Sequence, residues 1–167
     1  MGDAALSARH LVVRFVGALD PRGPGADGER WALDHLGSGE AALWCRQSGP
    51  DRRHSLGVAE AVVAALGDGA TRPVVAAALL HDVGKVEAGL GTLARVPATL
   101  AGMALGRRRW RGRLGTYLRH DEVGAALLSA VGADPLTVAW AAEHHQPAER
   151  WSVPPEVGAA LKAADGD

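Results

Sequence analysis

Hydrophobic side chains recur along this chain at helical spacing, and no segment alternates apolar and polar residues at the two-residue period of a strand. The segment 51–66 shows this spacing clearly, because its apolar side chains fall on one face of a helix. These side chains are Leu56, Val58, Val62, Val63 and Leu66. The pattern therefore predicts an all-α protein.

Breaks rich in glycine and proline separate the expected helices. Asp51 and Asp134 are the expected N-caps of two of them, and Pro135 strengthens the second start signal. We expect helices over residues 5–19, 29–47, 51–66, 71–84, 115–131, 136–146 and 156–165, with 86–113 irregular or weakly helical. The side chains of the second helix expected in the core are Trp31, Leu33, Leu36, Leu43 and Trp44.

The segment 74–82 is apolar nearly all round, which is typical of a helix at the centre of a core. His81 and Asp82 stand at its end. Burying an ionised carboxylate there is costly unless another group compensates its charge. A divalent metal would do so directly, with the adjacent imidazole as a second ligand.

Composition narrows the function classes further. A length of 167 residues favours one domain, and a net charge of −1 gives no general attraction to nucleic acid or to a membrane. Cys45 is the single cysteine, which excludes an intrachain disulfide and a zinc or redox site of the CxxC type. The chain shows no signal peptide and no membrane span, so we expect a cytoplasmic protein.

Metal-ligand residue types recur through the rest of the chain, each at or near the end of an expected helix. Antiparallel helices can point such side chains into one shared pocket. Besides His81 and Asp82, the series contains His54, His120, His144, His145 and Asp165.

These residues stand in motifs that resemble the HD-domain superfamily, whose pattern is H…HD…H…H…D. The motifs are Asp51-Arg52-Arg53-His54, Leu79-Leu80-His81-Asp82-Val83-Gly84-Lys85, Arg119-His120, Glu143-His144-His145 and Leu161-Lys162-Ala163-Ala164-Asp165. The resemblance covers about residues 50–165. It implies a compact single-domain helical bundle, with residues 50–167 as the HD metal-binding domain and 1–49 as an N-terminal helical extension packed on the core.

The resemblance also implies a set of metal ligands. One metal would be held by His54, His81, Asp82 and Asp165, and a second by His120 and His144, with Asp82 bridging the two. His145 can replace or supplement His144. Adjacent residues on a helix point about 100° apart, so both could serve one ion only if the helix ends there. The two divalent ions could be Mn, Fe, Mg, Ni or Co.

Two cations are candidates for binding the substrate. Lys85 follows the flexible Gly84 three residues after Asp82, so it can reach the same pocket and bind a phosphate oxygen. The alternative is a solvated lysine that interacts with a helix dipole. Arg53, beside His54, is a weaker candidate for the same work. Asp82 and Lys85 are thus the expected catalytic residues.

The resemblance favours a metal-dependent phosphohydrolase or phosphodiesterase that acts, through a metal-activated water, on a nucleotide-like or other small phosphorylated substrate. A mixed-valent di-iron oxygenase of the HD type is the first alternative, because it uses a similar ligand set. A catalytically silent HD module that binds a ligand or regulates a partner is the second. No Gly-Tyr-Pro element follows His145, which disfavours the cyclic di-GMP branch.

The basic run 107–113 allows two interpretations: it could hold phosphates over the site, or it could be a solvated loop. Only Trp110 interrupts the run as an aromatic residue, so a nucleic-acid partner is disfavoured. The chain ends two residues after Asp165, which would leave the site open or completed by a partner subunit in a homodimer.

Overall fold

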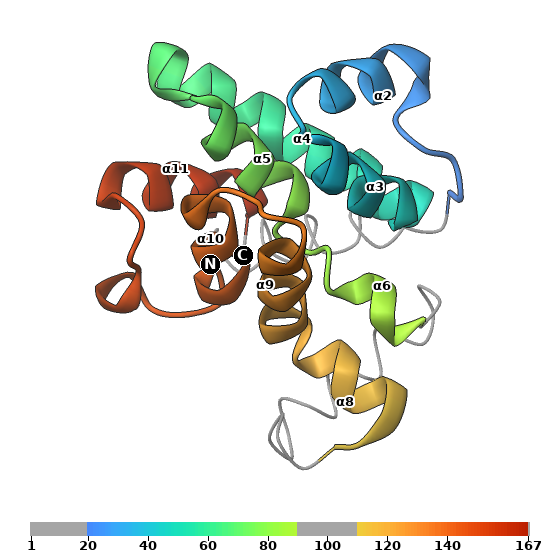
Figure 1. The fold of residues 1–167 in the computed structure, drawn as a ribbon. Coiled ribbons are helices and arrows are strands. Elements are labelled where there is room, and N and C mark those ends of the chain that lie inside the picture. The colour runs from blue at the N-terminus through green and yellow to red at the C-terminus, as the bar shows by residue number, and fades with distance from the viewer. Residues whose placement is uncertain (1–19, 90–109, 167) are drawn as a thin grey trace, which may run out of the picture.

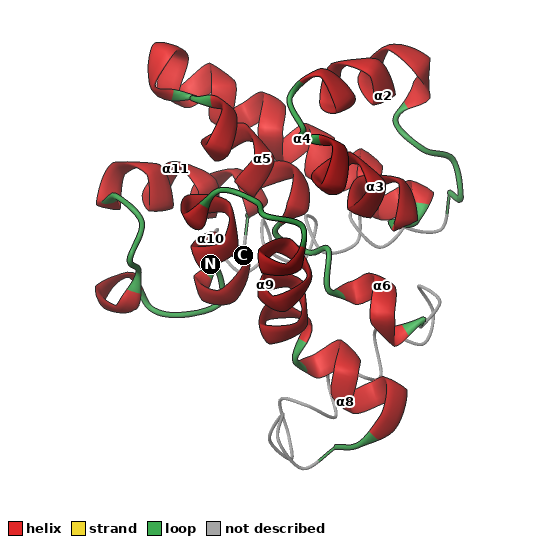
Figure 2. Ribbon diagram, in the orientation of Figure 1, coloured by secondary structure: helices red, strands yellow, loops and turns green. Residues whose placement is uncertain are grey.

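The computed structural model describes residues 20–89 and 110–166, and all regular structure in these segments is helical (Figure 2), which confirms the predicted all-α class. The α-helices are α2 (Gly25–Asp34), α3 (Ser38–Arg46), α4 (Gly49–Leu66), α5 (Arg72–Leu80), α6 (Lys85–Ala88), α8 (Gly112–Leu118), α9 (His120–Ala130), α10 (Pro135–Glu143) and α11 (Pro155–Asp165). Short 3₁₀ turns follow α4 (η1, Gly67–Gly69) and precede α11 (η3, Ala148–Arg150). The helix expected over 5–19 lies outside the described residues.

Helix α5 forms the centre of the molecule, as its apolar sequence predicts. Every residue from Val74 to Leu80 is buried. The helix packs against α4, α10 and α3, and Figure 1 shows it (green) passing between them. Its C-terminal end leads into the turn 81–84, which therefore begins deep inside the core.

The single helix expected over 29–47 is wrong. Helix α2 ends at Asp34 and α3 begins at Ser38, because the chain turns at Gly37, where the backbone N–H donates to the Glu40 carboxylate at 2.7 Å. Leu33, expected in the core, is 38% exposed at the end of α2. The other expected core residues are buried or half-buried, and those of α2 and α3 share one apolar core with α4 and α5. The division between an extension and a domain at residue 49 stays a prediction.

Two helix starts differ from expectation. Ser48, not Asp51, is the N-cap of α4, since its hydroxyl accepts the N–H of Asp51 at 3.3 Å and Pro50 lies within the first turn. The helix expected over 115–131 is two helices, because the backbone departs from helical geometry at Arg119 (φ −117°, ψ 31°). Asp134 caps α10 as predicted, accepting the N–H of Leu136 at 2.8 Å.

Helices α6 and α8 form a smaller apolar cluster at the bottom of Figure 1, built on Ala88, Tyr117 and Leu118. Part of the basic run, 107–109, lies outside the described residues. Arg111 and Arg113 are exposed, and Arg113 donates to the carbonyl of Ala88 at 2.9 Å. None of the helices in the described parts of the chain is long and apolar enough to cross a membrane.

Candidate metal centre

The fold brings the six predicted ligands into one region. His54 lies in the second turn of α4 and His120 begins α9, whereas the other four lie at or just beyond the C-terminal ends of α5, α10 and α11. Helix C-termini carry partial negative charge, so three helix dipoles favour a cation at this place. The predicted ligands at those ends are His81 and Asp82 (α5), His144 (α10) and Asp165 (α11).

One group of candidate ligands consists of His54, His81 and Asp165, whose ligand atoms all lie within 4.8 Å of one another. The Nε2 of His54 is 2.9 Å from Oδ1 of Asp165, and the Nε2 of His81 is 3.6 Å from the same oxygen. His81 and Asp165 are buried, and the His54 side chain is 30% exposed. This group therefore reaches from the core to the surface.

A second group consists of His120, His144 and His145, again with ligand atoms within 4.8 Å of one another. The two Nε2 atoms of His120 and His145 are 3.1 Å apart. Helix α10 ends at Glu143, with His144 as its C-cap, so the chain meets the condition for both adjacent histidines to face one point. His145 joins this group although it is more exposed than the other two.

Asp82 lies between the two groups and turns a different oxygen to each. Its Oδ1 is 3.1 Å from Nε2 of His120 and 3.9 Å from Nε2 of His144. Its Oδ2 is 3.4 Å from Nε2 of His81 and is ion-paired with the Lys85 ammonium. This is the arrangement that a bridging carboxylate requires.

Hydrogen bonds from the far ring nitrogens fix the orientation of the buried imidazoles. The Nδ1 atoms of His81, His120 and His144 each donate to the carbonyl three residues earlier, at 2.8, 2.8 and 3.0 Å. A carbonyl can only accept, so Nδ1 carries the proton and the lone pair of a neutral ring is on Nε2, which faces Asp82. Metal-binding histidines in proteins are commonly held in this way.

Several buried polar atoms of the site still need a partner, and a pair of cations would supply it. The Nε2 atoms of His81 and His144 are buried and have no hydrogen-bond partner among the described residues. The Nε2 of His120 and Oδ1 of Asp82, at 3.1 Å, need a proton or a metal ion between them. Imidazole nitrogens and carboxylate oxygens suit Mn, Fe, Ni and Co, whereas Mg prefers oxygen ligands. The residues present therefore fit Mn, Fe, Ni and Co among the predicted metals, and fit Mg less well.

The pKa values indicate that positive charge in the metal-free site is held at His81 and not at His144. Burial lowers the pKa of His81, but the carboxylates of Asp82 and Asp165 outweigh it and raise this pKa to about 9. Burial and repulsion by His81 lower the pKa of His144 to about 2. Burial alone would raise the pKa of Asp82, but Lys85 and His81 hold it well below its usual range. The carboxylates thus stay ionised inside the core.

Lys85 and Arg53, the two candidate substrate cations, have different surroundings. The Lys85 side chain, 20% exposed, is ion-paired with Asp82, and this carboxylate raises the pKa of Lys85 against the effect of burial. The Arg53 guanidinium donates to the backbone carbonyls of Asp20 and Arg22. Lys85 is therefore better placed to meet a substrate at the candidate metal centre.

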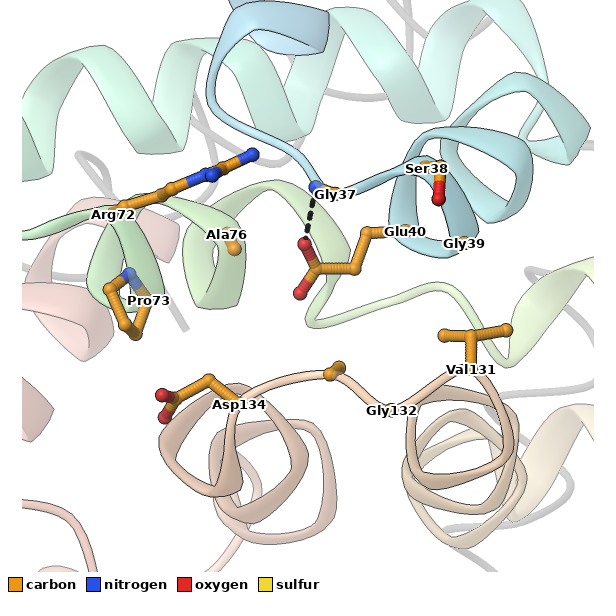
Figure 3. A pocket seen from close by; sticks show the side chains of 11 residues that line it. Gly37, Ser38, Gly39, Glu40, Arg72, Pro73, Ala76, Val131, Gly132 and Asp134 are labelled. Atoms are coloured by element: carbon orange, nitrogen blue, oxygen red, sulfur yellow. Dashed lines mark hydrogen bonds between the residues drawn. The ribbon is translucent and has the colours of Figure 1, made fainter.

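A cavity of about 340 Å³ lies away from these residues, at the N-terminal end of α5 (Figure 3). His81 follows the opposite end of the same helix. The two carboxylates that line the cavity cap nearby helices: Glu40 accepts the N–H of Gly37, and Asp134 accepts that of Leu136. The cavity is therefore separate from the metal centre.

Sequence reasoning missed two features that position the ligands. Gly84 and Gly124 let α9 approach the turn 81–84, and a Cβ on Gly84 would lie 1.9 Å from the carbonyl oxygen of His120. Lys162 donates to the carbonyl of His144 at 3.1 Å. Gly84 within the motif was the available signal for the first, while the second depends on a tertiary contact between α10 and α11.

Comparison with known proteins gives a family. A family model described as HD domain matches residues 52–166, which is more than half of the chain. Searches of curated proteins and of solved structures found no match. The matched range includes all six predicted ligands and Lys85.

Proposed function

The chain belongs to the HD-domain family, and we propose that it is a metal-dependent phosphohydrolase or phosphodiesterase acting on a small phosphorylated substrate, such as a nucleotide. The observation that carries this proposal is the position of Asp82 between two groups of imidazoles, with the half-buried Lys85 ion-paired to it.

The proposed metal ligands divide between two positions. His54, His81 and Asp165 would hold one divalent ion, His120 and His144 the second, and Asp82 would contribute one oxygen to each. His145 lies within reach of the second position. Two such ions supply Lewis acidity toward a phosphoryl oxygen and toward an attacking water.

Residues of the chain itself would bind and orient the substrate. His54, Lys85 and His145 are the site residues whose side chains reach solvent, so a ligand would meet them first. Lys85 would bind a non-bridging phosphate oxygen with its ammonium group while staying close to Asp82. A cation held in a partly dry site favours the negative charge that develops in phosphoryl transfer.

Purified protein with its metal content measured provides the test. We expect metal-dependent hydrolysis of at least one member of a panel containing nucleotides, cyclic nucleotides and an aryl phosphate. A chelator should abolish this activity, and added Mn, Co or Ni should restore it. The variant Asp82→Ala is the inactive control, and Asp134→Ala, at the N-cap of α10, is the active one.

Other outcomes would contradict the proposal. Two irons with a mixed-valent EPR signal and no phosphate-ester turnover would indicate the oxygenase alternative. Fully metallated protein that is inactive toward phosphate esters and toward oxygen-dependent cleavage would indicate a silent binding module.

A further inference from the structure

Lys162 connects two of the helices that end at the metal centre. It lies in the last turn of α11, one turn before Asp165, and its ammonium donates to the carbonyl oxygen of His144 at 3.1 Å. His144 is the C-cap of α10. The chain has only two lysines, and the other, Lys85, is ion-paired with Asp82.

The carbonyl that Lys162 binds lies at the C-terminal end of α10, between two candidate metal ligands. Carbonyls at a helix C-terminus lack partners within their own helix, so a cation there forms a charge-assisted hydrogen bond. This carbonyl belongs to the peptide bond between His144 and His145, whose ring centroids are 4.0 Å apart. The orientation of this one peptide plane thus affects the direction in which both imidazoles point.

The ammonium of Lys162 ties this peptide bond to α11. The Nδ1 of His144 donates back into its own helix, to Ala141 and Trp140. Those hydrogen bonds fix the ring relative to α10, and the turn that follows is closed by the N–H of Gln146, which donates to the carbonyl of Glu143 at 2.7 Å. The contact from Lys162 holds that turn against the helix that carries Asp165.

We propose that Lys162 is a positioning residue, which holds the His144–His145 peptide bond so that both imidazoles face His120 and the second metal position. The part that concerns metal affinity rests on the proposed function. The orientation of the two rings does not require a metal, so it can be measured in the metal-free protein. The two parts can therefore be tested separately.

The first experiment uses metal-free protein and NMR of the histidine ring nitrogens. In Lys162→Met we expect the ring signals of His144 and His145 to shift, while those of His54 and His81 stay in place. Lys162→Arg, which keeps a donor at this position, should restore the wild-type signals. Arg150→Met is the matched control, because it removes one exposed positive charge from η3.

The result can overturn the proposal in two ways. Unchanged His144 and His145 signals in Lys162→Met would show that the contact does not orient them. Equal shifts of all four histidines with a lower melting temperature would show a general structural role only. If Lys162→Met does not fold, Lys162→Ala, which also lacks a donor, is measured in its place and judged by the same criteria.

The second experiment titrates Co²⁺ into the same proteins and follows the cobalt absorption bands. We expect one of the two binding phases, the one that belongs to the second position, to lose about ten- to a hundredfold in affinity in Lys162→Met, as is usual when a residue behind a metal ligand is removed. The other phase should stay close to its wild-type affinity. Equal weakening of both phases would overturn the assignment to the second position. A wild type that binds one cobalt contradicts the two-metal proposal, while the NMR result still decides the role of Lys162.

Discussion

The Cα of Gly84 faces the carbonyl oxygen of His120 so closely that a Cβ on residue 84 would lie 1.9 Å from that oxygen. The same Cβ would lie 2.6 Å from the backbone nitrogen of Gly124. Both contacts are with backbone atoms of α9, so they cannot be relieved by a side-chain rotation. The lack of a side chain at Gly84 therefore allows His120 to approach Asp82.

We expect Gly84→Ala to push α9 away from the turn 81–84 and to move His120 from Asp82. Overpacking of this kind costs about 1–3 kcal/mol of stability. The second metal should be lost before the first, because the ligands of the first do not lie on α9. Thermal unfolding and metal content measure the two effects.

Gly57→Ala is the matched control for this change. Gly57 lies inside α4, and a Cβ there would meet no atom of the described residues within 4 Å. This variant should be more stable by about 0.5–1 kcal/mol, because alanine favours the helix, and should keep its metals. Full metal occupancy and wild-type stability in Gly84→Ala would contradict the close-packing argument.

Asp82→Ala should abolish the binding of both metals, because each oxygen of this carboxylate faces a different imidazole group. Its loss also leaves the half-buried Lys85 ammonium without its counterion. Metal analysis after purification without chelator is the measurement. Asp134→Ala should cost about 1 kcal/mol through loss of the α10 cap and leave metal content unchanged. A fully metallated Asp82→Ala protein would exclude Asp82 as a ligand.

Lys85→Ala should weaken phosphate-ester turnover while both metals remain bound. Losing one charge-assisted contact in a partly dry site costs about 1.5–3 kcal/mol, or roughly ten- to a hundredfold in kcat/KM. The comparison is Arg53→Ala, whose guanidinium donates to the carbonyls of Asp20 and Arg22. This variant should lose stability rather than turnover. Equal kinetics of Lys85→Ala and wild type would identify Lys85 as a counterion of Asp82 and nothing more.

Local signals predicted much of the fold. The apolar run 74–82 indicated the buried α5, and Asp134 followed by Pro135 indicated the start of α10. The breaks at Gly37 and Arg119 were missed, because a glycine or an arginine within a helical pattern does not by itself end a helix. The break at Gly37 depends on the hydrogen bond from its N–H to the Glu40 carboxylate, which the hydrophobic pattern does not encode.

The ligand residues and their division into two groups could be predicted through the resemblance, but the place of His145 could not. Whether His145 joins His144 depends on where α10 ends, and helix ends are poorly defined by sequence. The approach of His120 to Asp82 depends on contact between two glycine backbones. The bond from Lys162 to His144 joins two helices, and no periodicity within either one encodes it.

Metal binding near neutral pH should release a proton from His81. In the metal-free protein its pKa is raised to about 9, so at pH 7.5 the ring is protonated and must lose that proton to bind an ion. His144, with a pKa lowered to about 2, is already neutral and should release none. Affinity at the first position should therefore rise with pH, by up to about tenfold per unit, and level off above pH 9.

The raised pKa of His81 also determines how the stability of the metal-free protein depends on pH. A raised folded-state pKa means that protonated His81 stabilises the fold fully below its unfolded pKa of about 6.5, and that this contribution is lost as pH rises through 9. Chelator-treated protein should lose this contribution between pH 7 and 9, whereas metallated protein should not.

Calorimetric titration with metal at pH 7.5, in buffers of different ionisation enthalpy, counts the protons that metal binding releases. Release of about one proton is expected, and His81→Gln should release fewer than wild type. If the wild type releases no proton, His81 is already neutral in the metal-free protein. Asp82 and Asp165 would then not keep its ring protonated.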